Sequence, residues 1–415
     1  MPSNLRVDAD RLWQSLMTMA EIGATSGGGV GRLALTDSDR AARDLFKGWC
    51  EEAGCTVTVD GLGNMFARRA GTRDDRLPVM VGSHLDSQPL GGKFDGAYGV
   101  LAGLEIVRTL NDAGIRTEAP IDVVNWTDEE GARFAAGMGA SGAFCGLLDA
   151  KTVLAMEDPT GRTVGEELVR IGYAGPAPVG GRKLDSFFEA HIEQGPLLEA
   201  ADLAAGVVTG AQAQRCFQVT VTGEEGHAGT VPMDRRRDAL LGAARMVDAV
   251  ARLAFDFEPW PVITVAAMSV RPNARNTIAG LVTFTIDSRH PDDATLARIQ
   301  AAMEAACRKI AAADRLEVDF SQTSSRTAVT FDPERVALLR EVAGQLAMPT
   351  LDLYSGAGHD ACNLAQIAPT AMVFVRCAGG ISHNERESAD APDLAAGADL
   401  LLHAILARAG AVGRD

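Results

Sequence analysis

Hydrophobic and polar positions in the first half of the chain alternate between two periods. Residues 41–49 and 100–113 have the three-to-four-residue spacing of amphipathic helices, whereas 56–59, 77–81 and 121–126 are short apolar runs typical of strands. Strands that alternate with helices indicate crossover connections and a mostly parallel sheet, in which ligand sites gather at the C-terminal ends of the strands. We therefore expect an α/β fold with a mixed, mostly parallel sheet flanked by helices.

A different order of elements begins near residue 215. The pattern predicts strands at 216–221, 262–270, 281–287 and 316–320, and helices at 234–253 and from 291 to about 312. The order β-α-β-β-α-β is that of the split βαβ, or ferredoxin-like, α+β sandwich, which is a self-contained unit. The chain then returns to a helix, a strand and an alanine-rich last helix at 336–346, 371–376 and 394–410. We expect one α/β domain built from residues 1–213 and 329–415, with residues 214–328 inserted into it.

Composition and charge narrow the class of protein. The 415 residues carry a formal net charge of −16, which disfavours nucleic-acid and anionic-membrane partners because both require clustered Lys and Arg. The seven cysteines form no CxxC pair and are odd in number, so we expect no disulfide framework and a cytoplasmic location. The charged N-terminus does not resemble a signal peptide, and no apolar run approaches the roughly 20 residues of a spanning helix.

Two polar residues lie close together after the strand predicted at 77–81. His84 is followed by Asp86 on the same face, so we expect Asp86 to hydrogen-bond the ring of His84 and fix its tautomer. Asp95 lies between glycines eleven residues after His84, where the backbone can turn tightly and direct the carboxylate into a cleft. Each residue alone is also compatible with a purely structural role.

An acidic run, Asp128-Glu129-Glu130, follows the strand predicted at 121–126. Neighbouring side chains point in different directions, so one glutamate can bind a metal ion while the other faces a water molecule. A bound cation would remove the repulsion among the acids. The alternative is an acidic surface in contact with solvent.

Two further histidines are expected at strand-to-loop exits. His191 and Glu193 repeat the spacing of His84 and Asp86, with Glu193 as the expected orienting carboxylate, and His383 lies in a glycine-rich loop after the strand predicted at 371–376. Five groups then suit two bridged divalent ions: His84, Asp95, Glu130, His191 and His383. Imidazole with carboxylate favours zinc and tolerates manganese, cobalt or nickel. Glu129 would take a proton from water and return it to a leaving nitrogen, which indicates hydrolysis at a carbonyl carbon.

Seven short strings in a defined order carry a resemblance that covers nearly the whole chain: HLDSQPLGGKFDG, TDEEGARF, HIEQGP, GHAGTVPM, NARNTIAG, SGAGHDA and SHNE. They resemble the M20-type dinuclear metallohydrolases, specifically their amidase, hydantoinase and carbamoylase branch. The resemblance implies the same five metal ligands, with Glu129 as the general base. It also implies that substrate is bound by Gln194, His227, Asn276, Arg289 and Gly358.

The resemblance also implies roles for the two domains. Residues 1–213 and 329–415 would form the catalytic domain with its two metal ions, and residues 214–328 would be both a lid and the contact of a homodimer. In relatives, the histidine equivalent to His227 reaches the active site of the other subunit, where it would donate to the developing oxyanion.

The expected substrate is a small ureido acid. Hydrolysis of an N-carbamoyl amino acid would give the amino acid, carbon dioxide and ammonia, with the α-carboxylate held by Arg289 and Asn276. The open alternatives are allantoate amidohydrolase or β-ureidopropionase with the same site, a peptidase, and a metal-free relative that only binds a ligand. Arg289 also has the alternative of a surface ion pair with Asp287 or Asp292. The remaining histidines, His290, His359 and His403, are expected to have local structural roles.

Overall fold

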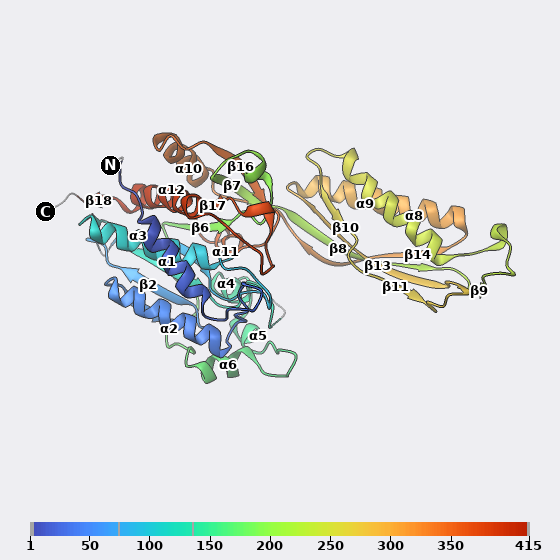
Figure 1. The fold of residues 1–415 in the computed structure, drawn as a ribbon, viewed down its shortest axis with the longest axis horizontal. Helices are drawn as coiled ribbons and strands as arrows, with labels where there is room; N and C mark the ends of the chain where they lie inside the picture. Colours follow the sequence, from blue (N-terminus) through green and yellow to red (C-terminus); the bar gives the residue numbers. More distant parts are fainter. Residues whose placement is uncertain (1–3, 74, 135–136, 413–415) are drawn as a thin grey trace. The chain divides into compact units, whose positions relative to one another are not determined.

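The chain divides into two compact units, which are described separately. The computed structural model describes residues 4–73, 75–134 and 137–412. Unit 1 comprises Met1–Thr209 and Thr330–Asp415, and unit 2 comprises Gly210–Val329 (Figure 1). The predicted insert, residues 214–328, lies within unit 2.

Unit 1 is built on a mixed nine-stranded sheet. Its strands are β1 (Thr56–Val59), β2 (Met65–Arg69), β3 (Val79–His84), β5 (Ile121–Trp126), β6 (Ser186–Ile192), β7 (Ala205–Ala211), β15 (Val329–Thr330), β16 (Thr350–Ser355) and β17 (Thr370–Val375). They are ordered β1-β2-β5-β3-β6-β17-β7-β15, with β16 also paired to β7. The four central strands β5, β3, β6 and β17 are parallel, whereas β2 and β7 join them antiparallel. Every residue of the four central strands is buried, which accounts for their nearly continuous apolar runs.

Helices cover this sheet. They are α1 (Ala9–Ala20), α2 (Asp37–Glu52), α3 (Ala97–Asp112), α4 (Gly139–Phe144), α5 (Ala150–Leu154), α6 (Val164–Ile171), α7 (Leu197–Ala200), α10 (Pro333–Gln345), α11 (Asp360–Leu364) and α12 (Ala391–Ala409). Helices α3 and α12 pack against central strands, and α1 packs against both of these helices. The 3-10 turn η3 (Ala378–Gly380) and the small pair β4 (Arg116–Thr117) and β18 (Ala411–Val412) complete the unit. The prediction of a mixed α/β fold with helices on a mostly parallel sheet is confirmed.

Local sequence explains where several helices begin. Helix α2 begins at Asp37, four residues before the predicted start, because the Thr36 side chain accepts a hydrogen bond from the Asp39 amide. In unit 2, the Asp238 carboxylate accepts hydrogen bonds from two main-chain amides at the start of α8. The helix predicted at 234–253 therefore begins only at Ala239.

Unit 2 has the split βαβ order. Its elements are β8 (Ala213–Thr222), β9 (Gly226–His227), η1 (Met233–Arg235), α8 (Ala239–Arg252), η2 (Leu253–Asp256), β10 (Val262–Thr264), β11 (Met268–Arg271), β12 (Thr277–Ile278), β13 (Leu281–His290), α9 (Asp293–Asp314) and β14 (Glu317–Arg326). The antiparallel sheet is ordered β10-β13-β8-β14, and β11 also pairs with β13. The single strand predicted at 262–270 is therefore two short strands, which together occupy one edge.

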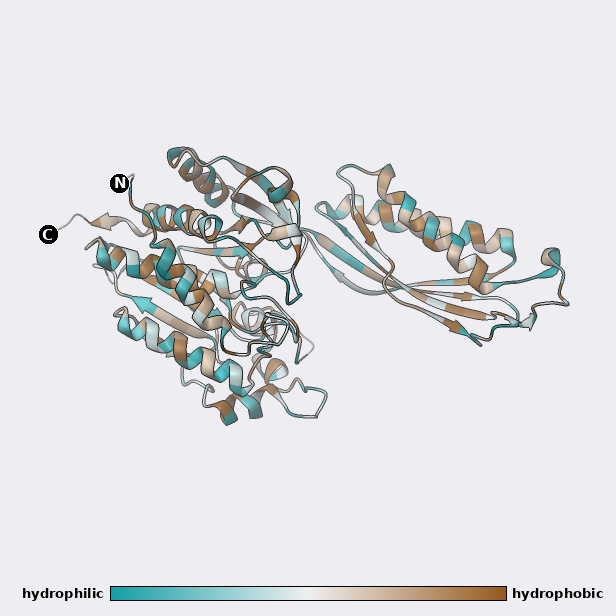
Figure 2. Cartoon of the chain, viewed as in Figure 1, coloured by the Kyte–Doolittle hydropathy of each residue, from teal (hydrophilic) through white to brown (hydrophobic). Residues whose placement is uncertain are grey.

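One apolar core holds unit 2 together. Phe217, Phe284 and Ile286 from the sheet pack with Met246 from α8 and Leu296 from α9. Hydrophobic and hydrophilic positions are mixed along α8 and α9, as expected for helices that cover one face of a sheet (Figure 2).

Two expectations from composition can be compared with the described part of the chain. All seven cysteines are free thiols in the structure. Among the helices of residues 4–73, 75–134 and 137–412, none combines the length and apolar character needed to cross a membrane.

Candidate metal centre and active site

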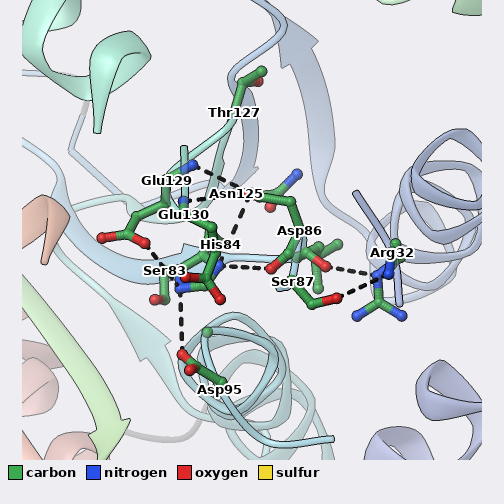
Figure 3. A network of polar contacts seen from close by, with 12 residues as sticks. Arg32, Ser83, His84, Asp86, Ser87, Asp95, Asn125, Thr127, Glu129 and Glu130 are labelled. Carbon is green, nitrogen blue, oxygen red and sulfur yellow. Dashed lines mark hydrogen bonds and ion pairs between the residues drawn. The ribbon is translucent and has the colours of Figure 1, made fainter. Parts of the chain in front are cut away.

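The predicted ligands of unit 1 converge at one edge of the central sheet. His84 is the last residue of β3, Glu130 lies just after β5, and His191 is the second-last residue of β6. Because β5, β3 and β6 are parallel, their C-terminal ends meet at the same edge. Asp95 comes from the loop before α3, and His383 from the loop between β17 and α12. Figure 3 shows Asp95, His84, Glu129 and Glu130 around one centre.

The two carboxylate oxygens of Asp95 face two different groups of ligands. Oδ1 lies 3.0 Å from His191 Nε2 and 3.7 Å from His84 Nε2. Oδ2 lies 3.4 Å from His383 Nε2, and the same nitrogen lies 3.4 Å from Glu130 Oε2. In the described residues, the donor atoms of each trio, His84–Asp95–His191 and Asp95–Glu130–His383, lie within 4.8 Å of one another. Asp95 is the one member that the trios share, which is the position of a bridging carboxylate.

Main-chain contacts orient two of the imidazole rings. Nδ1 of His84 lies 2.9 Å from the Asp86 carbonyl oxygen, and Nδ1 of His191 lies 2.9 Å from the Ile192 carbonyl oxygen. A carbonyl only accepts, so Nδ1 of each ring carries the hydrogen and Nε2 is left with its lone pair. The main-chain N–H of Gly96, which donates to His191 Nε2 at 3.3 Å, agrees with this tautomer.

The donor set fits divalent cations. Neutral imidazole nitrogens facing a buried carboxylate oxygen need a cation or a proton between them. Burial alone would lower the pKa of His191, but its hydrogen bond to Asp95 and the charge of that carboxylate raise the pKa to about 9. Burial likewise opposes ionisation of Asp95, yet the contacts with His191 and His383 hold its pKa well below the usual value. Both shifts describe a proton held between His191 Nε2 and Asp95 Oδ1, and a divalent cation bound there would take the place of that proton.

Glu129 belongs to neither trio of the described residues. Its Oε2 lies 3.5 Å from His84 Nε2, and the side chain is buried beside the trios. Burial, followed by the charges of Asp360 and Glu130, raises the pKa of Glu129 well above the usual range. A carboxylate outside the ligand set and with a raised pKa suits proton transfer.

Asp86 supports the site differently from the sequence-based expectation. Its carbonyl oxygen, and not its carboxylate, is the hydrogen-bond partner of the His84 ring, because the carboxylate stands 3.9 Å from Nδ1. The carboxylate instead accepts from the main-chain N–H groups of Glu129 and Glu130, each at 3.3 Å (Figure 3). Asp86 therefore orients the ring through its main chain and the two glutamates through its side chain.

Glu193 does not orient His191. Its carboxylate accepts from the main-chain N–H groups of Leu197 and Leu198 at 2.7 and 2.8 Å, and so caps α7. The expectation of an orienting carboxylate is wrong here because the amides at the start of α7, which lack partners in the helix, take both of its oxygens.

Gln194 and Gly358 also lie in unit 1. The Gln194 Nε2 donates to Asp95 Oδ2 at 2.9 Å, while its amide oxygen is buried and has no hydrogen-bond partner among the described residues. Gly358 lies in the loop before α11, next to His359. The ring of His359 is 4.5 Å from that of His191, and its Nε2 lies 2.8 Å from Ser355 Oγ, in keeping with a structural role.

Four residues around the ligands were not singled out from the sequence. Gln88 donates to Glu130 Oε2 at 2.7 Å, and Ser83 donates to the buried Glu189 at 2.7 Å. The carboxylate of Glu387 accepts from the main-chain N–H groups of Phe94 and Asp95. Ser382 lies 3.1 Å from Asp95 Oδ2. Two of the four, Gln88 and Ser382, lie within the strings HLDSQPLGGKFDG and SHNE that carry the family resemblance.

Three predicted substrate residues lie in unit 2. His227 is paired with Thr277, and the amide of Ala228 donates to the Asn276 carbonyl at 2.9 Å, so His227 and Asn276 lie on one exposed ribbon. Arg236 holds this ribbon through hydrogen bonds to the Ala228 and Val231 carbonyls.

Arg289 lies at the other end of the unit 2 sheet. The ribbon adjoins the start of β13, because the Gly223 amide donates to the Gly280 carbonyl, whereas Arg289 is the second-last residue of that strand. The guanidinium donates to both oxygens of Asp287, at 2.9 and 3.0 Å. The ion pair with Asp287, one of the alternatives from the sequence, is therefore present.

A comparison with protein families gives the context of this site. The model of the peptidase family M20/M25/M40 matches residues 80–407. The chain belongs to this family. The assignment from the ordered strings is thereby confirmed.

Individual relatives support the assignment to the amidase, hydantoinase and carbamoylase branch. The chain is 50% identical over 405 residues to an N-carbamoyl-L-amino-acid amidohydrolase of Rhizobium meliloti, with 97% of each chain covered. It is 33% identical over 393 residues to the allantoate amidohydrolase of Escherichia coli, with 94% of this chain and 95% of the relative covered. The crystal structure of an amidase of the hydantoinase/carbamoylase family from Burkholderia multivorans has a TM-score of 0.95 at 57% identity, with 98% of each chain covered. The family and the His/Asp/Glu cluster together indicate a divalent metal site.

Proposed function

We propose that this protein hydrolyses N-carbamoyl amino acids to the amino acid, carbon dioxide and ammonia. The observation that carries the proposal is the pair of ligand trios that share Asp95, with the buried carboxylate of Glu129 beside them and in neither. The relative with 50% identity, named as an N-carbamoyl-L-amino-acid amidohydrolase, supports this substrate class.

The site would hold two divalent ions, with zinc favoured and manganese, cobalt or nickel compatible. His84 and His191 would hold one ion, Glu130 and His383 the other, and Asp95 both. When bound, such ions polarise a carbonyl group and lower the pKa of a bridging water. His383 is about half exposed, whereas the other two histidines are buried, so we expect substrate to approach from the His383 side.

Glu129 would move the proton in this reaction. Its carboxylate takes a proton from the water that adds to the ureido carbonyl carbon, and returns it to the nitrogen that leaves when the C–N bond breaks. Its position beside His84 and outside both trios of the described residues suits both transfers. Gln194 and Gly358 would bind the ureido group.

Arg289, Asn276 and His227 would bind the substrate from two different chains. The rise of β13 separates Arg289 from the ribbon of His227 and Asn276 by about 27 Å, too far for one small substrate to touch both in the same chain. We therefore propose a homodimer in which each site combines Arg289 with the His227 and Asn276 of the partner chain. The edge formed by β10 and β11 exposes Val262 and Met268, which suits a contact between two inserted units.

The decisive experiment is a substrate panel with the purified full-length protein. Ammonia release is measured from N-carbamoyl-L-amino acids, N-carbamoyl-β-alanine and allantoate, before chelation, after chelation, and after zinc or manganese is restored. We expect N-carbamoyl-L-amino acids to be the preferred substrates. We expect the activity to be lost on chelation and to return when zinc or manganese is restored. A preference for allantoate, as in the name of the Escherichia coli relative, would move the assignment to that substrate. A protein that binds ligand but releases no ammonia from any substrate would be the metal-free binding relative.

Two variants test the assigned roles. Glu129→Gln should lower kcat by about 10²–10⁴-fold while the metal content stays unchanged. His227→Ala should also be inactive alone, and mixing it with Glu129→Gln should restore activity to about a quarter of the sites, because mixed dimers contain one intact site. No recovery after subunit exchange would argue against a site shared between chains.

A further inference from the structure

Glu387 is a buried carboxylate that joins the loops of two metal ligands. It lies four residues after His383, before α12 begins at Ala391. It belongs to neither ligand trio of the described residues. The hydrogen-bond partners of its carboxylate come from segments almost 300 residues apart in the chain.

The first carboxylate oxygen fixes the main chain of the bridging ligand. Oε1 of Glu387 accepts from the Phe94 amide at 2.9 Å and from the Asp95 amide at 3.1 Å. These amides lie just before α3, where the main chain has no helical partner for them. One oxygen therefore determines the direction in which the Asp95 side chain leaves the backbone.

The loop of Asp95 is built around this carboxylate. A Cβ atom at Gly92 would overlap the carboxylate carbon and oxygen of Glu387. The absence of a side chain at Gly92 thus makes room for Glu387.

The second oxygen contacts the loop of the other ligand. Oε2 of Glu387 accepts from Ser382 Oγ at 3.0 Å, and Ser382 precedes His383. The same hydroxyl lies 3.1 Å from Asp95 Oδ2 and accepts from Gln194 Nε2 at 3.0 Å. A serine hydroxyl has one hydrogen, so Glu387 and Asp95 compete for it. A cation on Asp95 Oδ2 would leave that hydrogen to Glu387.

We propose that Glu387 is a positioning residue that holds Asp95 and the His383 loop in the arrangement that binds both metal ions. This inference rests on the metal centre of the proposed function. Because Asp95 is shared by the two trios, its displacement weakens both ions together.

Three variants separate positioning from a general loss of structure. Glu387→Ala removes both carboxylate contacts. Glu387→Gln keeps an oxygen for the amides of Phe94 and Asp95 and replaces the oxygen that accepts from Ser382 with an N–H donor. Glu193→Gln is the matched control, because its carboxylate also accepts two main-chain amides but serves α7 and no ligand loop.

Metal binding itself is the readout. Metal-free full-length proteins are dialysed against buffered zinc, and the bound metal is counted by mass spectrometry. Samples loaded with cobalt are compared by their visible absorption spectra, which report the number and geometry of the metal ligands. We expect Glu387→Ala to bind both ions about 10–100-fold more weakly, with an altered cobalt spectrum. Glu387→Gln should stay within about threefold of wild type, and Glu193→Gln should be indistinguishable from it.

The inference is overturned if Glu387→Ala keeps wild-type affinity and spectrum, or if only one of the ions is weakened. If Glu387→Ala does not fold, Gly92→Ala displaces the same carboxylate from the other side and should weaken both ions, and normal binding by that variant would equally overturn the inference. A wild-type protein that binds metal but hydrolyses no ureido acid would refute only the proposed function. A wild-type protein that binds no divalent ion would refute both.

Discussion

The ion pair between Arg43 and Asp39 in α2 offers a stringent stability test. Both side chains are fully buried, and Arg43 Nε lies 2.8 Å from Asp39 Oδ2. Arg43 also donates to the Gly63 carbonyl at 2.7 Å and to Thr127 Oγ1 at 3.3 Å, and Thr127 begins the loop that carries Glu129. Arg43→Met keeps much of the buried volume and removes all three contacts.

The structure sets the expected magnitude. Among the described residues, the Asp39 carboxylate then keeps one hydrogen-bond donor, the Leu35 amide, and the Gly63 carbonyl loses its contact with the guanidinium. Removing one partner of a buried pair costs about 3–5 kcal/mol, because the other charge is left without compensation. Combining Arg43→Met with Asp39→Asn should recover about 2 kcal/mol of this loss, since the isolated charge is gone.

The same helix supplies a matched control. Arg40 and Asp44 have the same four-residue spacing, but both are more than half exposed and their closest atoms are 3.7 Å apart. Arg40→Met should therefore cost no more than about 0.5 kcal/mol. Urea unfolding followed by tryptophan fluorescence compares the variants. If Arg43→Met and Arg40→Met agree within about 1 kcal/mol, the assignment of Arg43 as a buried structural cation is refuted.

Three further outcomes follow from individual side chains. Asp95→Ala should lose both metal ions, whereas His383→Ala should lose one, and metal analysis of the dialysed proteins distinguishes the two patterns. Arg289→Ala should raise KM for N-carbamoyl amino acids by about 10–100-fold with little change in kcat, and an unchanged KM would remove Arg289 from the substrate site. Burial raises the pKa of Asp399 to about 6, so the folded state binds its proton more tightly than the unfolded state. Wild type should therefore lose about 1–2 kcal/mol relative to Asp399→Asn as pH rises from about 4 to 7, and a constant difference in urea midpoint across that range would contradict the shift.

Short-range patterns predicted the fold and the convergence of the candidate ligands. A parallel strand ends where its apolar run ends, so His84, Glu130 and His191 were placed at a shared edge from local sequence alone. The inserted unit was equally visible, because the order of its strands and helices differs from the alternation before it. Two details of this unit were missed: the helix predicted at 234–253 begins only at Ala239, and the predicted strand 262–270 is interrupted between β10 and β11.

The supports of the ligands were predicted less well. Asp86 and Glu193 each follow a histidine by two residues, so both carboxylates were expected to orient that histidine. In the structure, the Asp86 carboxylate accepts from the Glu129 amide, and the Glu193 carboxylate accepts from the Leu197 amide. The spacing of two residues along a strand predicts which side chains lie on the same face. It does not predict which nearby main-chain amides lack a hydrogen-bond acceptor. Glu387 was missed because its partners Phe94 and Asp95 are almost 300 residues away, and Gly92, which makes room for it, was read only as a turn residue.

Arg289 lies near the end of strand β13 and Asn276 precedes that strand, which keeps the two residues apart in a single chain. Both were expected on one substrate carboxylate, although the strand predicted at 281–287 already lies between them. A strand of that kind holds its two ends about 20 Å or more apart, so one chain cannot bring both residues to a small molecule. Either one residue has no contact with substrate, or two chains share each site. The second explanation keeps a function for the exposed ribbon of His227 and Asn276, whose main chain Arg236 holds in place from within unit 2. A ribbon fixed in this way suits a residue that must act on a partner chain.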